Sequence, residues 1–342
     1  MHSTSLDELH ILIIVDNETD TLSSVDDGVP QQPELIGHLS RLDRRSLDGH
    51  ACSEPFDHLC VACHGFSALA TGRVGTETHS VLFDVGPYPR VWLDNAERLA
   101  VDLASIEVVF LSHWHFDHSG GLPEVVAAIS AARRARGLPA PRVDLHPDRP
   151  DQRGVMLRDG SLALLPGEPS LDALRAAGGD VVTEREPHLI ASAFFYGSGA
   201  IQRQTSYETG LPGHHSVRAG ELVPDPLIMD ERYLAADVRT RGLTLFSACS
   251  HAGIVNVCLD AQAKTPAQPI DLVLGGFHLA GKQMERRIDP TLEDLRTRVR
   301  PNLLAPGHCT GWRAKAALAR AFTPQHYAPS VVGSSYRLVA SA

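Results

Sequence analysis

The stretch that decides the fold is His113-Trp114-His115-Phe116-Asp117-His118, which carries three histidines and one aspartate. Residues 106–111, directly before it, form an apolar run rich in β-branched side chains, which is typical of a buried strand. Ser119-Gly120-Gly121 follows, and a helical pattern opens at Leu122. Imidazole nitrogens and carboxylate oxygens are ligands of zinc and its first-row neighbours. One histidine would fit an ordinary polar loop, but this cluster between a strand and a helix predicts a metal site.

Several motifs outside this stretch point to a family. The pattern H-x-H-x-D-H-S-G-G at 113–121 resembles the signature of the metallo-β-lactamase superfamily, and the strand-then-aspartate run SVLFDVG at 80–86 resembles the element before it. Four further motifs are similar to the branch named after the synthase that joins a dihydropterin to ribofuranosylaminobenzene phosphate. They are HGFS at 64–67, SACSHAGIVN at 247–256, GGFHL at 275–279 and PGHCTG at 306–311. The resemblance runs, with gaps, from about Leu9 to His308.

This resemblance implies an α/β protein with an αββα sandwich, in which two mixed β-sheets are flanked by helices. We expect a single domain over 1–342, because the chain has neither internal repeats nor a low-complexity linker. Two loop excursions are expected at about 18–57 and 192–237. The first is polar, acidic and broken by Pro and Gly, and the second is irregular in pattern.

The coarse pattern predicts further elements. Strands are expected at 9–15, 66–71, 80–85, 142–145, 243–246 and 272–274. Helices are expected at 122–136, 170–177, 254–263, 290–300 and 312–322. The motifs fall at strand ends, where loops on a rigid scaffold present functional groups.

The resemblance also implies a ligand set. His113 and His115 would bind one metal together with a third histidine, for which His251 is the first candidate because it follows the strand at 243–246. Asp117, His118 and His308 would bind the second metal. Rival third ligands for the first metal are His214, His215 and His146, and Pro212-Gly213-His214 resembles an element of other branches. Two divalent ions are expected, zinc first, with manganese or iron as alternatives.

The chain departs from many superfamily members at one place. A Gly-Asp pair, whose aspartate bridges the two metals, commonly ends the strand equivalent to 243–246. Here Ala248-Cys249-Ser250-His251 follows that strand instead. The lost carboxylate leaves a less anionic ligand set and opens the question of which metals bind. Cys249 and Cys309, each near a predicted ligand, are expected to line the site.

Other residues have a structural and a functional interpretation. Asp84 is expected to hold the loop of 113–118 by hydrogen bonds rather than to bind metal. His278 is either a core histidine or, as its motif favours, a catalytic residue beside Asp117. Lys282, Arg286 and Arg287 form either a solvated helix face or a site for an anionic group. Low-priority pocket candidates are Asn17, Arg203, Glu208 and Asn256.

Composition excludes some functions. The chain has 31 Lys and Arg against 41 Asp and Glu, a net charge of −10, which argues against a binder of nucleic-acid backbones. No apolar run approaches the roughly 18 residues that span a bilayer, and the N-terminus lacks the pattern of a signal peptide. We therefore expect a cytoplasmic protein with a small-molecule substrate and with neither nucleic-acid nor membrane partners.

The six cysteines allow alternatives. Cys60-Val61-Ala62-Cys63-His64 matches the pattern of c-type haem attachment, but that chemistry occurs outside the cytoplasm, so chance is favoured. Cys52, Cys60 and Cys63 would form a structural zinc site with a histidine such as His50 or His58 if the fold brought them together. Otherwise they are free thiols.

The function expected from these features is metal-assisted hydrolysis. Two metals would polarise the scissile bond of an ester, lactone or phosphoester and lower the pKa of a bridging water from about 16 toward neutrality. Asp117 would orient the resulting hydroxide, and His278 would stabilise an oxyanion or protonate the leaving group. One alternative is a transferase that joins a pterin-like diphosphate to an aromatic acceptor. Another is a non-catalytic ligand-binding protein on the same scaffold, against which six well-placed ligands argue.

Overall fold

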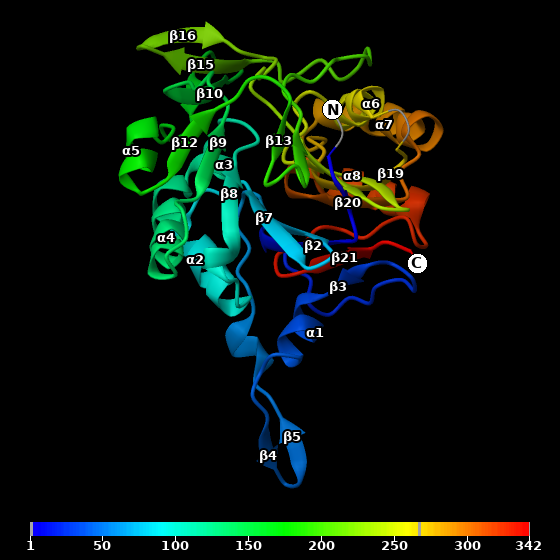
Figure 1. The fold of residues 1–342 in the computed structure, drawn as a ribbon. Helices are drawn as coiled ribbons and strands as arrows, with labels where there is room; N and C mark the ends of the chain where they lie inside the picture. The colour runs from blue at the N-terminus through cyan, green and yellow to red at the C-terminus, as the bar shows by residue number, and fades with distance from the viewer. Residues whose placement is uncertain (1–2, 266–267, 342) are drawn as a thin grey trace.

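The computed structural model describes residues 3–265 and 268–341. Two large β-sheets pack face to face, and helices cover the outer face of each (Figure 1). The predicted αββα sandwich of two mixed sheets is therefore confirmed. Within the described residues, every helix is too short or too polar to cross a lipid bilayer.

The first sheet has eight strands in the order β12-β9-β8-β7-β6-β2-β21-β3. Its strands are β12 (Asp180–Thr183), β9 (Arg142–Leu145), β8 (Ile106–Phe110), β7 (Glu77–Phe83), β6 (Ser67–Val74), β2 (Glu8–Val15), β21 (Ser335–Val339) and β3 (Gln31–Gln32). Strands β7, β8 and β9 run parallel, whereas β2, β6 and β7 pair antiparallel. The covering helices are α2 (Pro89–Arg98), α4 (Leu122–Ala135) and α5 (Leu171–Ala176).

The second sheet has seven strands. They are β13 (His188–Ile190), β14 (Phe195–Gly197), β17 (Leu234–Val238), β18 (Gly242–Ser247), β19 (Ile270–Gly276) and β20 (Leu303–Gly307), with β1 (Ser5–Leu6) beside β17. Strands β18, β19 and β20 run parallel. The covering helices are α6 (Ile254–Lys264), α7 (Ile288–Asp294), which continues as a π-helical turn (Leu295–Val299), and α8 (Trp312–Phe322).

Strand residues alternate between two cores, because successive side chains point to opposite faces of a sheet. Val108 and Phe110 of β8 lie in the core between the sheets, whereas Val109 packs under helices α2 and α4. Both faces of this strand are thus buried from Val108 onward, which explains why residues 108–111 are apolar without alternation. A third core lies between the second sheet and its helices.

The segment 18–57 is not one irregular loop. It contains β3, helix α1 (Glu34–Leu39), the hairpin β4 (Arg45–Leu47) with β5 (His50–Cys52), and a 3-10 turn (Pro55–His58). In Figure 1 the β4–β5 hairpin projects beyond the sandwich, away from α3 (Phe116–Ser119). The hairpin therefore does not cover the loop that carries the metal-ligand motif.

The segment 192–237 is also more regular than its sequence indicates. It supplies β14 and most of β17 to the second sheet, and two strands of a separate four-stranded sheet, β11-β10-β15-β16. The strands of this small sheet are β10 (Gln152–Met156), β11 (Leu162–Leu164), β15 (His214–Arg218) and β16 (Glu221–Pro224). Besides the turn at Pro55–His58, the described residues include 3-10 turns at Leu103–Ser105, Met284–Arg287 and His308–Thr310.

Candidate metal centre

The loop of residues 111–118 is held by a buried carboxylate. Strands β7 and β8 are parallel with Phe83 opposite Phe110, so Asp84 lies beside the start of this loop. Asp84 accepts hydrogen bonds from the Ser112 backbone N–H and hydroxyl, both at 2.7 Å, and from His118 Nδ1 at 2.8 Å. Asp84 is fully buried and has a left-handed φ of 57°. The expectation that Asp84 positions the loop agrees with these contacts.

The other candidate ligands come from the ends of parallel strands. Ser247 of β18 is opposite Gly275 of β19, and Gly276 is opposite Gly307 of β20. The loops that follow these strands therefore open at the same edge of the sheet, and they carry His251, His278 and His308. This arrangement brings residues far apart in sequence to the end of β8.

His113, His115 and His251 form the first ligand group. Three nitrogens meet: His113 Nε2 and His115 Nδ1 are 2.9 Å apart, His115 Nδ1 and His251 Nε2 3.1 Å, and His251 Nε2 and His113 Nε2 3.2 Å. A tetrahedral zinc ion, with bonds of about 2.0–2.1 Å, holds its nitrogen ligands roughly 3.3 Å apart. Burial, together with the neighbouring charged groups, holds the pKa of all three histidines well below its usual value, so their lone pairs are free.

Hydrogen bonds on the far side of two rings fix the tautomers. Ser112 gives its proton to Asp84, so its hydroxyl oxygen accepts from His113 Nδ1 at 2.9 Å and leaves Nε2 bare toward the group. His214 Nδ1 donates to the Asp225 carbonyl at 2.7 Å, so His214 Nε2 accepts from His115 Nε2 at 2.9 Å. The Nδ1 of His115 is then bare as well. Two bare nitrogens this close repel each other unless a cation lies between them.

Asp117, His118, His308 and Cys249 form the second group, in which all ligand atoms lie within 4.8 Å of one another. Asp117 Oδ2 is 3.3 Å from His308 Nε2 and 3.7 Å from His118 Nε2. His118 Nδ1 is engaged by Asp84, and His308 Nδ1 donates to Asn17 Oδ1 at 2.9 Å. The Nε2 of His308 is buried and makes no well-aligned hydrogen bond, although Asp117 Oδ2 lies 3.3 Å away. The donor set and this orphaned nitrogen fit a divalent metal.

The two groups differ in charge. Burial alone would lower the pKa of His118, but the carboxylates of Asp117 and Asp84 outweigh it and raise the pKa to about 9. Burial alone would raise the pKa of Asp117, but His118, His308 and His64 together hold it well below its usual value. Without metal, the second group is therefore an ion pair, whereas the first group is neutral.

Sequence reasoning missed His64 as a member of this site. His64 Nε2 is 3.3 Å from Asp117 Oδ2, and Asn17 Nδ2 donates to His64 Nδ1 at 3.0 Å. Asn17 also bonds the His308 ring, so this pocket candidate does lie at the centre. The available signal was the position of His64 in the motif HGFS, because no spacing rule ties residue 64 to residue 117.

His278, the expected catalytic partner of Asp117, lies beside His251 of the first group. Its ring centroid is 4.4 Å from that of His251, and its side chain meets Cys249 and Cys309. Its Nδ1 is buried without a hydrogen-bond partner. Burial lowers the pKa of His278, but Cys309 and Glu231 outweigh this and raise it. A group with an unsatisfied ring nitrogen next to a metal position is suited to meet a substrate.

The rival third ligands lie outside the first group. His214 contacts the far nitrogen of His115, as described above. His215 Nδ1 bonds the Gly213 carbonyl, and His146 Nδ1 accepts the Asp148 N–H at 3.2 Å. Geometry thus favours His251 over all three.

Two pocket candidates have structural roles instead. Glu208 accepts the backbone N–H groups of Val255 and Asn256 at the N-terminus of α6, at 3.0 and 2.9 Å. Asn256 accepts the backbone N–H groups of Gln204 and Thr205. Both are buried helix-to-loop contacts. Arg203 donates to the carbonyls of His251 and Leu227, so it supports the loop of a ligand.

In the basic cluster 282–287, Met284–Arg287 form a 3-10 turn rather than a helix face, and Lys282 precedes this turn. Arg287 donates to the Gly210 carbonyl at 2.8 Å, and its charge partly offsets the rise in the pKa of His278. Lys282 and Arg286 are exposed. Only Arg287 of this cluster is therefore placed near the metal centre.

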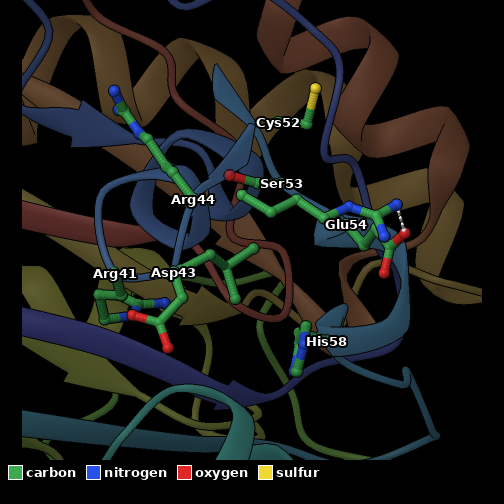
Figure 2. A pocket seen from close by; sticks show the side chains of 9 residues that line it. Arg41, Asp43, Arg44, Cys52, Ser53, Glu54 and His58 are labelled. Atoms are coloured by element: carbon green, nitrogen blue, oxygen red, sulfur yellow. Dashed lines mark hydrogen bonds and ion pairs between the residues drawn. The ribbon is translucent and has the colours of Figure 1, made fainter. Parts of the chain in front are cut away.

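The cysteines of 52–63 do not form the structural zinc site considered above. Among the described residues, Cys60 is grouped with Glu34 and His38, and neither Cys52 nor Cys63 joins a ligand group. His38 donates to Glu34 at 3.1 Å, and Glu34 also accepts the Cys60 N–H, which accounts for this cluster as a buried hydrogen-bond network. Cys52 instead lines a cleft of about 470 Å³ beside the β4–β5 hairpin, with Arg44 and His58 (Figure 2). No ligand of the metal centre lines that cleft.

Two adjoining groups of histidine and aspartate at the strand ends of an αββα sandwich define a metallo-β-lactamase-like protein. The family model described as metallo-beta-lactamase superfamily matches residues 70–220. This match agrees with the superfamily resemblance that the motifs predicted.

Two proteins of Methanocaldococcus jannaschii are similar to this chain over most of its length. The chain is 28% identical to 7,8-dihydropterin-6-methyl-4-(beta-D-ribofuranosyl)-aminobenzene-5'-phosphate synthase of Methanocaldococcus jannaschii, over 74% of this chain and 82% of the synthase. It is 26% identical to the uncharacterized protein MJ0448 of the same organism, over 76% of this chain and 88% of that protein. Both resemblances predicted from the motifs, to the superfamily and to this branch, are confirmed.

A solved structure supports the fold. Tm1679, described as a metal-dependent hydrolase of the beta-lactamase superfamily, superposes with a TM-score of 0.66 at 24% identity. The superposition covers 98% of this chain and 100% of Tm1679.

Proposed function

We propose that this protein is a metal-dependent hydrolase of a small, anionic organic ester, lactone or phosphoester. The observation that carries the proposal is the convergence of ligand atoms in two adjoining groups. His113, His115 and His251 would hold one divalent metal, zinc being expected. Asp117, His118 and His308 would hold a second. When bound, such ions polarise a carbonyl or phosphoryl oxygen and lower the pKa of water.

The protein's own residues account for the remaining steps. Asp117 is charged and touches His118, His308 and His64, so its carboxylate is placed to accept a hydrogen bond from an attacking water. His278, with its unsatisfied nitrogen, would donate to the oxygen that gains charge or to the leaving group. Arg287, whose charge acts on His278, would attract the anionic part of the substrate.

A transferase is the second candidate, and the similarity to a synthase over 74% of the chain favours it. The same ligand groups would then activate the diphosphate of a pterin-like electrophile while an aromatic acceptor attacks. A non-catalytic binding protein is disfavoured, because a site without chemistry has no need of six converging ligands.

Turnover tests separate these functions. The full-length protein, loaded with zinc, is offered phosphodiesters, lactones and thioesters, and separately a pterin diphosphate with an arylamine. Hydrolysis of at least one ester class, lost in Asp117→Asn, supports the hydrolase. Slow hydrolysis of every ester, with release of inorganic diphosphate only when the arylamine is present, supports the transferase. Metal-loaded protein that is inert in every assay contradicts both.

A further inference from the structure

Cys249 is the one residue shared by the two ligand groups within the described residues. Its Sγ lies within 4.8 Å of the ligand atoms of Asp117, His118 and His308. It also lies within 4.8 Å of the ligand atoms of His113 and His251. Its distance to His118 Nε2 is 3.2 Å, which is shorter than the contact between His118 and Asp117. The sulfur thus occupies the boundary between the two groups.

The backbone places this sulfur there. Cys249 follows β18, and its side chain is only 3% exposed. Gly276 of β19 leaves the space, because a Cβ at that position would lie 2.7 Å from the Cys309 sulfur and overlap the Ala248 carbonyl oxygen. The neighbouring residue Ser250 has a left-handed φ of 60° and donates to the Gly276 carbonyl at 2.6 Å, which fixes the turn after Cys249. The backbone around Cys249 therefore fixes the position of its sulfur.

With two divalent metals bound, the charge balance of the site favours a second anionic ligand beside Asp117. Two divalent ions bring four positive charges into a buried site, and Asp117 is the single anion among the six proposed ligands. Asp84 and Glu231 are engaged by Ser112 and by backbone N–H groups, respectively. A thiol that coordinates a metal loses its proton and supplies a negative charge at the ion itself.

We propose that the Cys249 thiolate is a ligand shared by both metal positions. This rests on the metal occupancy in the proposed function but not on the reaction. Cys309 is not the shared ligand, because its sulfur is grouped with Cys249 and His278 alone and joins neither His113 and His251 nor Asp117 and His118. It contacts the Cys249 sulfur at 3.5 Å and the Cys249 carbonyl at 3.4 Å.

The chemical class of the metal follows from the sulfur. Thiolate selects zinc, cobalt and cadmium, whereas a centre of carboxylate, carbonyl and water suits magnesium and manganese. The shared ligand therefore makes this a centre for borderline-soft ions. Replacing the sulfur by a carboxylate, in Cys249→Asp, keeps the charge and shifts the preference toward manganese.

Cobalt spectroscopy tests the proposal on the full chain. The metal-free protein is titrated with Co²⁺ without oxygen, and the near-ultraviolet sulfur-to-cobalt charge-transfer band is recorded. Wild type and Cys309→Ser are expected to show the band, and Cys249→Ser and Cys249→Asp to lack it. In Cys249→Ser, affinity for at least one Co²⁺ falls about tenfold or more. Cys249→Asp binds Mn²⁺ at least as tightly as the wild type.

The wild-type spectrum keeps the test decisive even if a variant fails to fold. Two bound Co²⁺ without a charge-transfer band overturn the proposal and leave the dinuclear centre standing. A band that disappears in Cys309→Ser but persists in Cys249→Ser also overturns it. A band assigned to Cys249 in a protein without hydrolytic or transferase activity retains this proposal and removes the proposed function.

Discussion

At the scale of single residues, the hydrogen-bond partners of the histidine ligands determine which ring nitrogen of each histidine can bind a metal. Each histidine of the two groups has one nitrogen directed inward, and for His113, His115, His118 and His308 an outer hydrogen bond holds the ring. Such outer partners fix the tautomer and raise the basicity of the inner nitrogen. His214 is the partner of His115, although its Pro-Gly-His motif made it a candidate ligand.

Replacement of His214 tests this positioning role. His214→Ala should weaken metal binding at the first group by roughly 10–100-fold, the loss typical of an outer-shell partner. His214→Gln should restore most of the affinity, because its amide can accept from His115. Isothermal titration with Zn²⁺ measures both, and His215→Ala serves as the control because His215 faces away from the group. Equal affinity of wild type and His214→Ala would refute the assignment.

Asp117 carries the largest expected effect on activity. Asp117→Asn keeps the shape but removes the charge, so the second metal should be lost and turnover should fall by at least ~10²-fold. The fold should be retained, because Asp117 itself lies outside the three hydrophobic cores. Asp94→Asn, which removes a surface ion pair with Arg90, is the control and should leave turnover unchanged. Full turnover by metal-loaded Asp117→Asn would assign the water-orienting role to another residue.

The charge difference between the groups predicts a pH dependence of metal binding. His118 has a pKa of about 9, so a metal at the second group must displace its proton below that pH. Affinity there should rise by on the order of tenfold per pH unit between pH 7 and 8. The three histidines of the first group, whose pKa values are depressed, are already deprotonated. In the Cys249→Ser background, where no thiol proton is released, the first group should therefore show no such rise. Chelator competition at both pH values, with Asp117→Asn isolating the first group, measures the two slopes.

At the scale of elements, the close approach of β18 and β19 aligns the loops of the centre. Gly275 has a φ of 121°, and a Cβ there would overlap the Ser247 carbonyl oxygen. Gly275→Ala should therefore lower the free energy of unfolding by more than about 2 kcal/mol. Gly281→Ala shares the positive φ of 92° but meets open space, so its cost should stay near 1 kcal/mol. Urea denaturation compares the two, and equal costs would contradict the packing argument.

The β4–β5 hairpin should be dispensable for the centre. It contacts no proposed ligand and projects away from the sandwich in Figure 1. Replacing residues 42–53 by a short Gly-Ser linker should leave metal stoichiometry and thermal midpoint close to the wild-type values. Elemental analysis and a melting curve provide the test, and loss of metal would tie the hairpin to the site.

Elements with a strong apolar period were predictable from the sequence. Strand β9 and helix α8 have the predicted bounds, and the buried positions of α8 recur at helical spacing. Helix α2 was missed, because its buried face includes Asn95, which bonds the Ile14 and Val61 carbonyls instead of packing as an apolar residue. The strands β15 and β16 were missed because β16 is exposed along its whole length. Patterns of burial cannot indicate a strand that is not buried.

At the scale of the whole molecule, the net charge of −10 argues against polymer substrates. Backbone binding to nucleic acid needs a basic track. Low-salt assays with RNA and single-stranded DNA should show no metal-dependent cleavage, whereas small esters or the pterin and arylamine pair react. Efficient cutting of either polymer would overturn the expectation of a small substrate.

The candidate site was only partly predictable from the sequence, because some of its contacts depend on the packing of the whole molecule. The spacing of residues within 113–118 predicts one ligand loop, and the motifs at strand ends predict His251 and His308 as further ligands. Cys249 was expected to line the site because it is close to His251 in sequence. Its position between the two ligand groups, and the contact of His64 with Asp117, depend on how β2, β6 and β18 pack around this loop, which no local pattern encodes. These contacts were therefore found in the structure and not in the sequence.

Metal content per chain tests the central claim most directly. Full-length protein is purified without chelator, supplied with zinc and analysed for elements alongside a His113→Ala, Asp117→Asn double variant. The account predicts close to two transition-metal ions per wild-type chain and far fewer in the variant. A wild-type protein that stays metal-free with zinc or manganese in excess would contradict the account.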